Sequence, residues 1–185
     1  MAHGPPTTQV ARLLQQDFEP IGLDVLHDHK QMGVDPPDKL GKIRSWFGSI
    51  YKSDAMLADL DIAVVSRHTG KVSVLIEIEE TTDKPKAILG DVLATLLGNS
   101  ITFQGKRHLH VGPWTTLVIM THNTNSSHLN RLLYLEEQSN QLRTHLSTPN
   151  ASIGRIILDA FQDAAELEHK LRVHIKIATE DGQYQ

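Results

Sequence analysis

The side chains best suited to chemistry are acids gathered in one short stretch, residues 58–80. Asp59 and Asp61 lie at the start of a β-type run, and Glu77 and Glu79 lie in a second run after a turn. Successive side chains of a strand point to opposite faces, so residues two apart share a face. The second run therefore places Glu77 and Glu79 together. Whether the two aspartates join them depends on the register of the hairpin.

A one-residue slip turns a whole strand over, so burial must choose the register. A two-residue turn would send Asp61 into the apolar side. A three-residue turn over residues 68–70, with Gly70 as the left-handed residue, pairs Asp61 with Glu77 and would pair Asp59 with Glu79. It makes the opposite face uniformly apolar, so we predict this register. That face would hold Val72, Val74, Ile76 and Ile78 with Leu60, Ile62 and Val64.

Four carboxylates at one end of a sheet face would lie roughly 5 Å apart across the strands. Each carboxylate raises its neighbours' pKa unless a cation lies among them. Clustered oxygen ligands are what Mg²⁺, Mn²⁺ and Ca²⁺ bind. The stretch therefore predicts a divalent-metal site, with Mg²⁺ or Mn²⁺ as the cofactor. The alternative is a sheet surface decorated with acids in a protein that serves as an assembly component.

The pattern resembles the PD-(D/E)xK phosphodiesterase superfamily, which has the restriction-endonuclease-like fold. Asp61 matches the aspartate of its motif and Glu77 matches the acid, at a spacing of 77 − 61 = 16 residues. Glu79 stands where the superfamily usually has lysine, which makes this an acid-x-Glu variant, and Leu60 replaces the usual proline. In element order, the resemblance covers roughly residues 7–120.

The resemblance implies a divalent-metal-dependent nuclease that hydrolyses phosphodiester bonds of nucleic acid, with DNA favoured over RNA. Asp61 and Glu77 would bind the metal, and Asp59 and Glu79 would support them. The alternative is a catalytically inactive nuclease-fold module that binds nucleic acid or a protein partner.

Three further residues are candidates by position. Lys84 and Lys86 follow the hairpin and could replace the missing lysine of the motif, either by meeting a phosphate or by balancing the acids. Glu19, at the end of the first expected helix, is a candidate additional metal ligand.

Composition narrows the class of protein. The chain has 185 residues and no cysteine, which excludes disulfides, thiolate zinc sites and cysteine nucleophiles. No apolar run approaches the length of a membrane helix, so we expect no membrane association and a cytoplasmic location. The net charge of −4 is unusual for a nucleic-acid-binding protein. A homodimer is left open.

The remaining sequence predicts one α/β domain, 1–185, with a central mixed β-sheet flanked by helices and a restriction-endonuclease-like core. We expect a disordered start at 1–6, the nuclease-like core at 7–121, C-terminal helices and a strand at 122–179, and a loose tail at 180–185. In the first half we expect a helix from Thr7 or Thr8 to about Asp17, a strand within 21–29 and, after the hairpin, a helix over 85–97 that is buried around most of its circumference. A central strand should follow over 115–121, and then a helix that is capped at Asn125 or Ser126 and ends near Leu146. The last expected elements are a strand or helix start at 155–158, a helix over 162–170 and a strand over 172–178.

Overall fold

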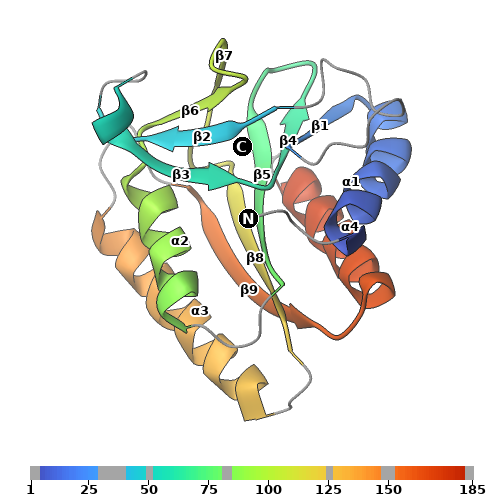
Figure 1. Ribbon diagram of the computed structural model, residues 1–185, viewed down its shortest axis with the longest axis vertical. Coiled ribbons are helices and arrows are strands. Elements are labelled where there is room, and N and C mark those ends of the chain that lie inside the picture. The colour runs from blue at the N-terminus through green and yellow to red at the C-terminus, as the bar shows by residue number, and fades with distance from the viewer. Residues whose placement is uncertain are drawn as a thin grey trace.

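The centre of the structure, a computed structural model, is a five-stranded mixed β-sheet (Figure 1). The structure describes residues 5–28, 41–48, 52–80, 85–123, 127–146 and 153–181. The helices are α1 (Pro5–Phe18), α2 (Pro85–Leu97), α3 (Ser127–Leu146) and α4 (Ala164–Asp181), with short 3₁₀ turns η1 (Glu19–Ile21) and η2 (Ser53–Ala55). The strands are β1 (Leu23–His27), β2 (Ile43–Trp46), β3 (Met56–Leu60), β4 (Ile62–Ser66), β5 (Val72–Glu79), β6 (Ser100–Phe103), β7 (Arg107–Leu109), β8 (Thr116–His122) and β9 (Arg155–Phe161).

The strand order in this sheet is β1-β4-β5-β8-β9. Strands β1, β4 and β5 pair antiparallel, whereas β5, β8 and β9 pair parallel. Helices α1 and α4 cover one face (Figure 1). Helices α2 and α3 cover the other face, together with a second, antiparallel sheet of order β3-β2-β6-β7. The prediction of an α/β fold with a mixed sheet between helices is therefore confirmed.

The alternation of side chains along β4 and β5 builds two apolar layers. One layer packs against α1 and α4 and includes Ile62, Val64, Val74, Ile76 and Ile78. The other packs against α2, α3 and the second sheet and includes Ala63, Val65, Leu75, Ile88, Val92 and Leu96. Because both faces are covered, the central strands are apolar on both sides, as the run at 115–121 predicts.

The hairpin has the predicted register near its acidic end but a different turn. Ile62 pairs with Ile76 and Val64 with Val74, as predicted. The turn is closed by the Ser66 amide donating to the Lys71 carbonyl at 2.9 Å, so the loop is longer than expected. A bulge between Val64 and Val65 restores the register. It also turns Val72 to the α2 side, so the prediction that Val72 shares a face with Val74 is wrong.

Two helices differ from the sequence prediction in one respect each. Helix α1 starts at Pro5, because proline is tolerated in a first helical turn. Helix α2 has the predicted bounds but is buried on one side only. Its Leu89, Leu93 and Leu97 are 38%, 40% and 44% exposed, because α2 packs against the rest of the fold along the side that carries Ile88, Val92 and Leu96.

The predicted strand over 172–178 is wrong, because α4 continues through it as one helix. The alternation of Val173, Ile175 and Ile177 is real in the sequence, but only Ile175 is buried; it continues the helical stripe of Leu167 and Leu171. No proline or glycine interrupts the helix there. The stripe covers one face of the central sheet.

Polar contacts join α4 to the edge strand β9. Asp159 accepts a hydrogen bond from Lys170 Nζ at 2.9 Å and contacts His174 Nε2 at 2.9 Å.

Helix α3 ends at Leu146 as predicted, and 155–158 forms part of β9. The predicted cap at Asn125 or Ser126 and the end of the tail lie outside the described residues. Within the described ranges, none of the helices is both long and apolar enough to cross a bilayer.

Candidate functional site

Asp61 lies at the point where the chain changes sheets. Strand β3 pairs with β2 in the second sheet, and β4 pairs with β5 in the central sheet. Asp61, between them, is only 4% exposed. Its Oδ2 accepts a hydrogen bond from the backbone amide of Ile78 at 2.8 Å. That amide lies beyond the last β4–β5 pair, so the Asp61 side chain replaces the missing strand partner.

Glu77 lies beside Asp61 and is 9% exposed. Burial raises the pKa of the Glu77 carboxyl well above its usual range, and the charges of Asp61 and Asp91 raise it further. A hydrogen bond with Asp61 and the charge of Glu79 act in the same direction. The structure thus brings Asp61 and Glu77 together as predicted.

Asp91 on α2 is a member of this acidic cluster that the sequence analysis did not find. Burial raises the pKa of Asp91 to about 6, with contributions from the charges of Glu79 and Asp61. A signal was present in the sequence. Asp91 is the sole charged residue between Ala87 and Leu97, and its spacing places it on the same side of the helix as Ile88 and Thr95. An acid on the inner side of an apolar helix indicates a specific environment.

Glu79 lies at the end of β5, half-buried, and pairs in register with Thr121 of β8. Its charge acts on both Glu77 and Asp91, so it belongs to the cluster. Lys86 is exposed on α2. Five residues correspond to roughly 140° around a helix beyond one full turn, so Lys86 lies on a different side of α2 from Asp91. Lys84 lies outside the described residues.

Asp59 does not join the cluster, and its predicted pairing with Glu79 is wrong. Strand β3 leaves the hairpin before Asp61, so Asp59 pairs with Arg44 of β2. Its carboxylate forms ion pairs with Arg44 Nε at 3.2 Å and with Lys42 Nζ at 3.0 Å. The prediction failed because it continued the hairpin through a position where the chain changes sheets.

Glu19 lies at the other end of the hairpin, beside the turn. Its carboxylate is 3.7 Å from Arg67, whose guanidinium also donates to the Glu19 carbonyl. Strand β5 separates the turn from Glu79 by about 23 Å, so Glu19 is remote from the cluster.

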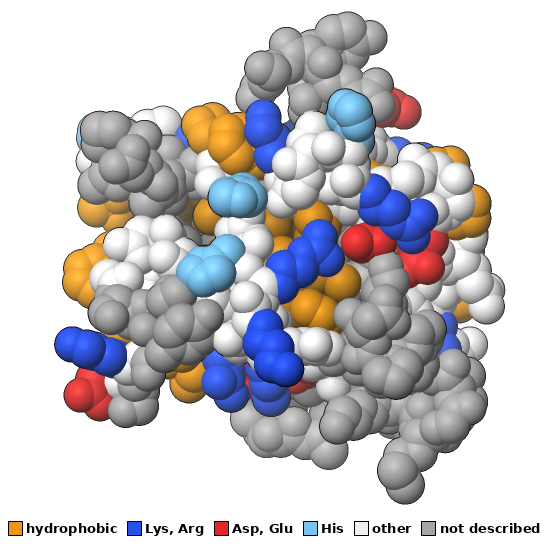
Figure 2. All heavy atoms as spheres, turned by 90° about the horizontal axis from the view of Figure 1, so that it is seen from above, with side chains coloured by type: hydrophobic (Ala, Val, Ile, Leu, Met, Phe, Trp, Pro, Cys, Tyr) orange, Lys and Arg blue, Asp and Glu red, His pale blue; other side chains and the backbone are white. Residues whose placement is uncertain are grey.

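Figure 2 looks onto the turn end of the hairpin and shows Lys, Arg and His side chains across the middle of the face. A groove of about 710 Å³ there is lined by Arg67 and Lys71 among others.

The side chains of the acidic cluster are of the type that binds divalent cations. None of the described groups that shift the pKa of Glu77 or Asp91 is a cation. All the donors are carboxylate oxygens, and Mg²⁺ is commonly held by one or two carboxylates together with water and substrate phosphate. Within the described ranges, no three acidic or histidine side chains are arranged to hold an ion as they stand. The fit therefore rests on the Asp61–Glu77 pair, with Glu79 and Asp91 nearby.

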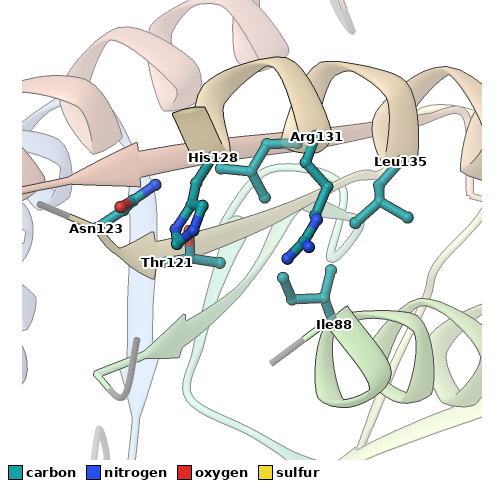
Figure 3. Close-up of a pocket in the computed structure, with 7 residues that line it drawn as sticks. Ile88, Thr121, Asn123, His128, Arg131 and Leu135 are labelled. Carbon is teal, nitrogen blue, oxygen red and sulfur yellow. The ribbon is translucent and has the colours of Figure 1, made fainter. Parts of the chain in front are cut away.

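A narrow pocket lies next to the cluster, where β8 ends and α3 begins (Figure 3). Its polar side chains come from both elements: Thr121 and Asn123 follow the strand, and His128 and Arg131 lie on the first turns of α3. The lining also includes Ile88, Leu132 and Leu135. No function was predicted for these residues from the sequence.

Comparisons with known proteins add no relative. No family model matches the sequence, no curated protein matches it, and no solved structure matches the fold. The functional argument therefore rests on the residues and their arrangement.

Proposed function

We propose that the protein is a divalent-metal-dependent hydrolase of phosphodiester bonds in nucleic acid, with Asp61 and Glu77 as the ligands of Mg²⁺ or Mn²⁺. The observation that carries the proposal is the convergence of Asp61, Glu79 and Asp91 around the buried Glu77, with no cation among the described groups that shift the pKa of Glu77 or Asp91. Like charges held together in this way oppose folding unless a proton or a metal ion compensates them.

The element order gives further support. The β4–β5 hairpin, helix α2 and the parallel strand β8 come in the order that the resemblance to the PD-(D/E)xK superfamily requires, with strands β6 and β7 of the second sheet between α2 and β8. Asp61 precedes one strand of the hairpin and Glu77 lies in the next, so the two motif acids meet across the pair. The cluster lies at the carboxyl ends of parallel strands, where α/β sheets commonly bind ligands.

Each residue then has a role set by its position. Asp61 is oriented by the Ile78 amide, and Glu77 faces it from β5. A bound divalent ion would supply Lewis acidity for the attack of water on phosphorus and would offset charge on the phosphate. Glu79 and Asp91, which lie near the pair, would orient that water by hydrogen bonds.

The test uses isosteric variants and a matched control from the same stretch. Calorimetric titration with Mg²⁺ and Mn²⁺ would be run on wild-type protein, Glu77→Gln and Asp59→Asn, followed by incubation with plasmid and single-stranded DNA. We expect saturable metal binding and cleavage by wild type and Asp59→Asn, and loss of both in Glu77→Gln. No saturable binding by the wild type, or equal behaviour of the two variants, would end the proposal.

One observation favours a second function, a nuclease-fold module that binds nucleic acid or a protein without cleaving. Glu79 replaces the usual lysine, and the described candidate for its replacement, Lys86, is exposed on another side of α2. Metal binding without cleavage of any of these substrates in the same experiment would favour this function over hydrolysis.

A further inference from the structure

The pocket beside the carboxylates is close enough to serve the same ligand. Thr121, in its wall, is the register partner of Glu79 on the neighbouring strand. Ile88, on the opposite wall, lies one helical turn before Asp91 on α2. The pocket and the acidic cluster are therefore neighbours along two elements, β8 and α2. A phosphate bound in the pocket would lie beside the metal ligands.

The polar lining of the pocket is suited to an anion. His128 points from α3 toward Thr121 at the end of β8, and Arg131 points from α3 toward Ile88 on α2 (Figure 3). Thr121 and Asn123 are 4% and 7% exposed and add a hydroxyl and an amide. The pocket volume of about 10 Å³ is that of one water-sized group, so it would hold one oxygen of a phosphate and not a base. The first turn of a helix favours negative charge as well.

The pocket and the acidic cluster carry side chains of opposite charge. Arg131 and His128 line the pocket, and the carboxylates of Glu77, Glu79 and Asp91 lie beside it. A cationic side chain next to a carboxylate cluster matches a substrate whose phosphate meets the cation on one side and a carboxylate-held metal on the other.

We propose that Arg131 and His128 form a phosphate-binding subsite that positions the nucleic-acid backbone next to Asp61 and Glu77. The identification of the ligand as nucleic acid rests on the proposed function. Arginine suits this task because its planar guanidinium can donate two parallel hydrogen bonds to a phosphate. The subsite would supply a cation that the motif lacks at Glu79.

The test measures binding separately from catalysis. Fluorescence anisotropy would follow a labelled duplex oligonucleotide in chelator-containing buffer over a series of salt concentrations. The variants are Arg131→Ala, Arg131→Lys and His128→Ala. The control is Arg155→Ala, which removes the same exposed charge at the first residue of β9, the opposite end of the parallel strands. Circular dichroism would verify that each variant is folded.

We expect Arg131→Ala to weaken binding about tenfold, as for loss of a charge-assisted hydrogen bond. The slope of log affinity against log salt should fall by about one. Arg131→Lys should be intermediate, His128→Ala should weaken binding in the same direction, and Arg155→Ala should resemble wild type. Equal losses in Arg131→Ala and Arg155→Ala, or none in Arg131→Ala, would overturn the subsite. If these variants behave as expected but wild type binds no metal in calorimetry, the subsite stands and the hydrolase proposal fails.

Discussion

Replacing Asp91 by asparagine should stabilise the protein at neutral pH. The Asp91 side chain is half-buried on the inner side of α2, close to the charges of Glu79 and Asp61. Burial and these charges raise its pKa from 3.8 to about 6, so the ionised form is disfavoured in the folded state. Asparagine has nearly the same shape without the charge. The variant therefore removes the repulsion and keeps the packing.

The magnitude follows from the pKa. A rise from 3.8 to about 6 at 1.36 kcal/mol per pKa unit corresponds to about 3 kcal/mol. Because the carboxyl is only partly buried, solvent screening reduces this to about 1–2 kcal/mol. Because the folded-state pKa of Asp91 is raised, the stability that its protonated form contributes is fully present below the unfolded-state pKa. This stability is lost as pH rises through about 6. Wild type should lose this stability between about pH 4 and pH 7, and Asp91→Asn should not.

Urea denaturation in chelator-containing buffer, followed by fluorescence of Trp46 and Trp114, measures the free energy of unfolding at each pH. We expect Asp91→Asn to exceed wild type by about 1–2 kcal/mol near pH 8 and to match it near pH 4. Removing the Asp91 charge would also bring the pKa of Glu77 closer to its usual range, and this would add to the gain in stability. Glu180→Gln, at an exposed acid of α4, serves as the control. A gain that is independent of pH, or a loss near pH 8, would refute this reasoning.

Three further predictions test the packing. Burial tends to raise the pKa of Asp159, but hydrogen bonds from two side chains of α4 and one backbone amide lower it to about 2. Asp159→Asn should therefore lower stability by about 1 kcal/mol at neutral pH, an effect lost as pH falls from about 4 toward 2 in urea titrations. Leu96→Ala should destabilise by about 2–4 kcal/mol, and the exposed Leu97→Ala by under about 1 kcal/mol. Ile175→Ala should likewise exceed Ile177→Ala by about 2 kcal/mol in calorimetric melting, whereas equal effects would contradict a helix there.

Local signals in the sequence predicted the elements near the site well. Pro85 and Gly98 bound α2, and the continuous apolar run at 115–121 predicted a central strand. The hairpin register was predictable because a slip would have exposed an entire apolar face. For that reason the proximity of Asp61 and Glu77 followed from pairing alone.

Other features depend on contacts that no short stretch contains. Strand β3 leaves the hairpin because β2 offers it another edge, and the partner of Asp59 is Arg44. Asp91 meets Glu79 only when α2 packs on the sheet. The sequence of 172–178 fits a strand and a helix equally. The segment is helical because Ile175 continues the buried helical stripe of Leu167 and Leu171. These outcomes are set by tertiary packing, which overrides local pattern.

Asp61 has one observed role and one proposed role, and substitution can separate them. Its side chain satisfies the Ile78 amide, and its charge would hold the metal. Asparagine retains an oxygen that can accept the amide hydrogen bond, whereas alanine leaves a buried donor unsatisfied at about 1–3 kcal/mol. Asp61→Ala should thus be less stable than Asp61→Asn by about that amount in urea denaturation. Both variants should lose metal binding in calorimetry. If Asp61→Asn bound Mg²⁺ like wild type, then Asp61 would serve only to satisfy the Ile78 amide, and any metal site would have to be built on Glu77, Glu79 and Asp91 without it.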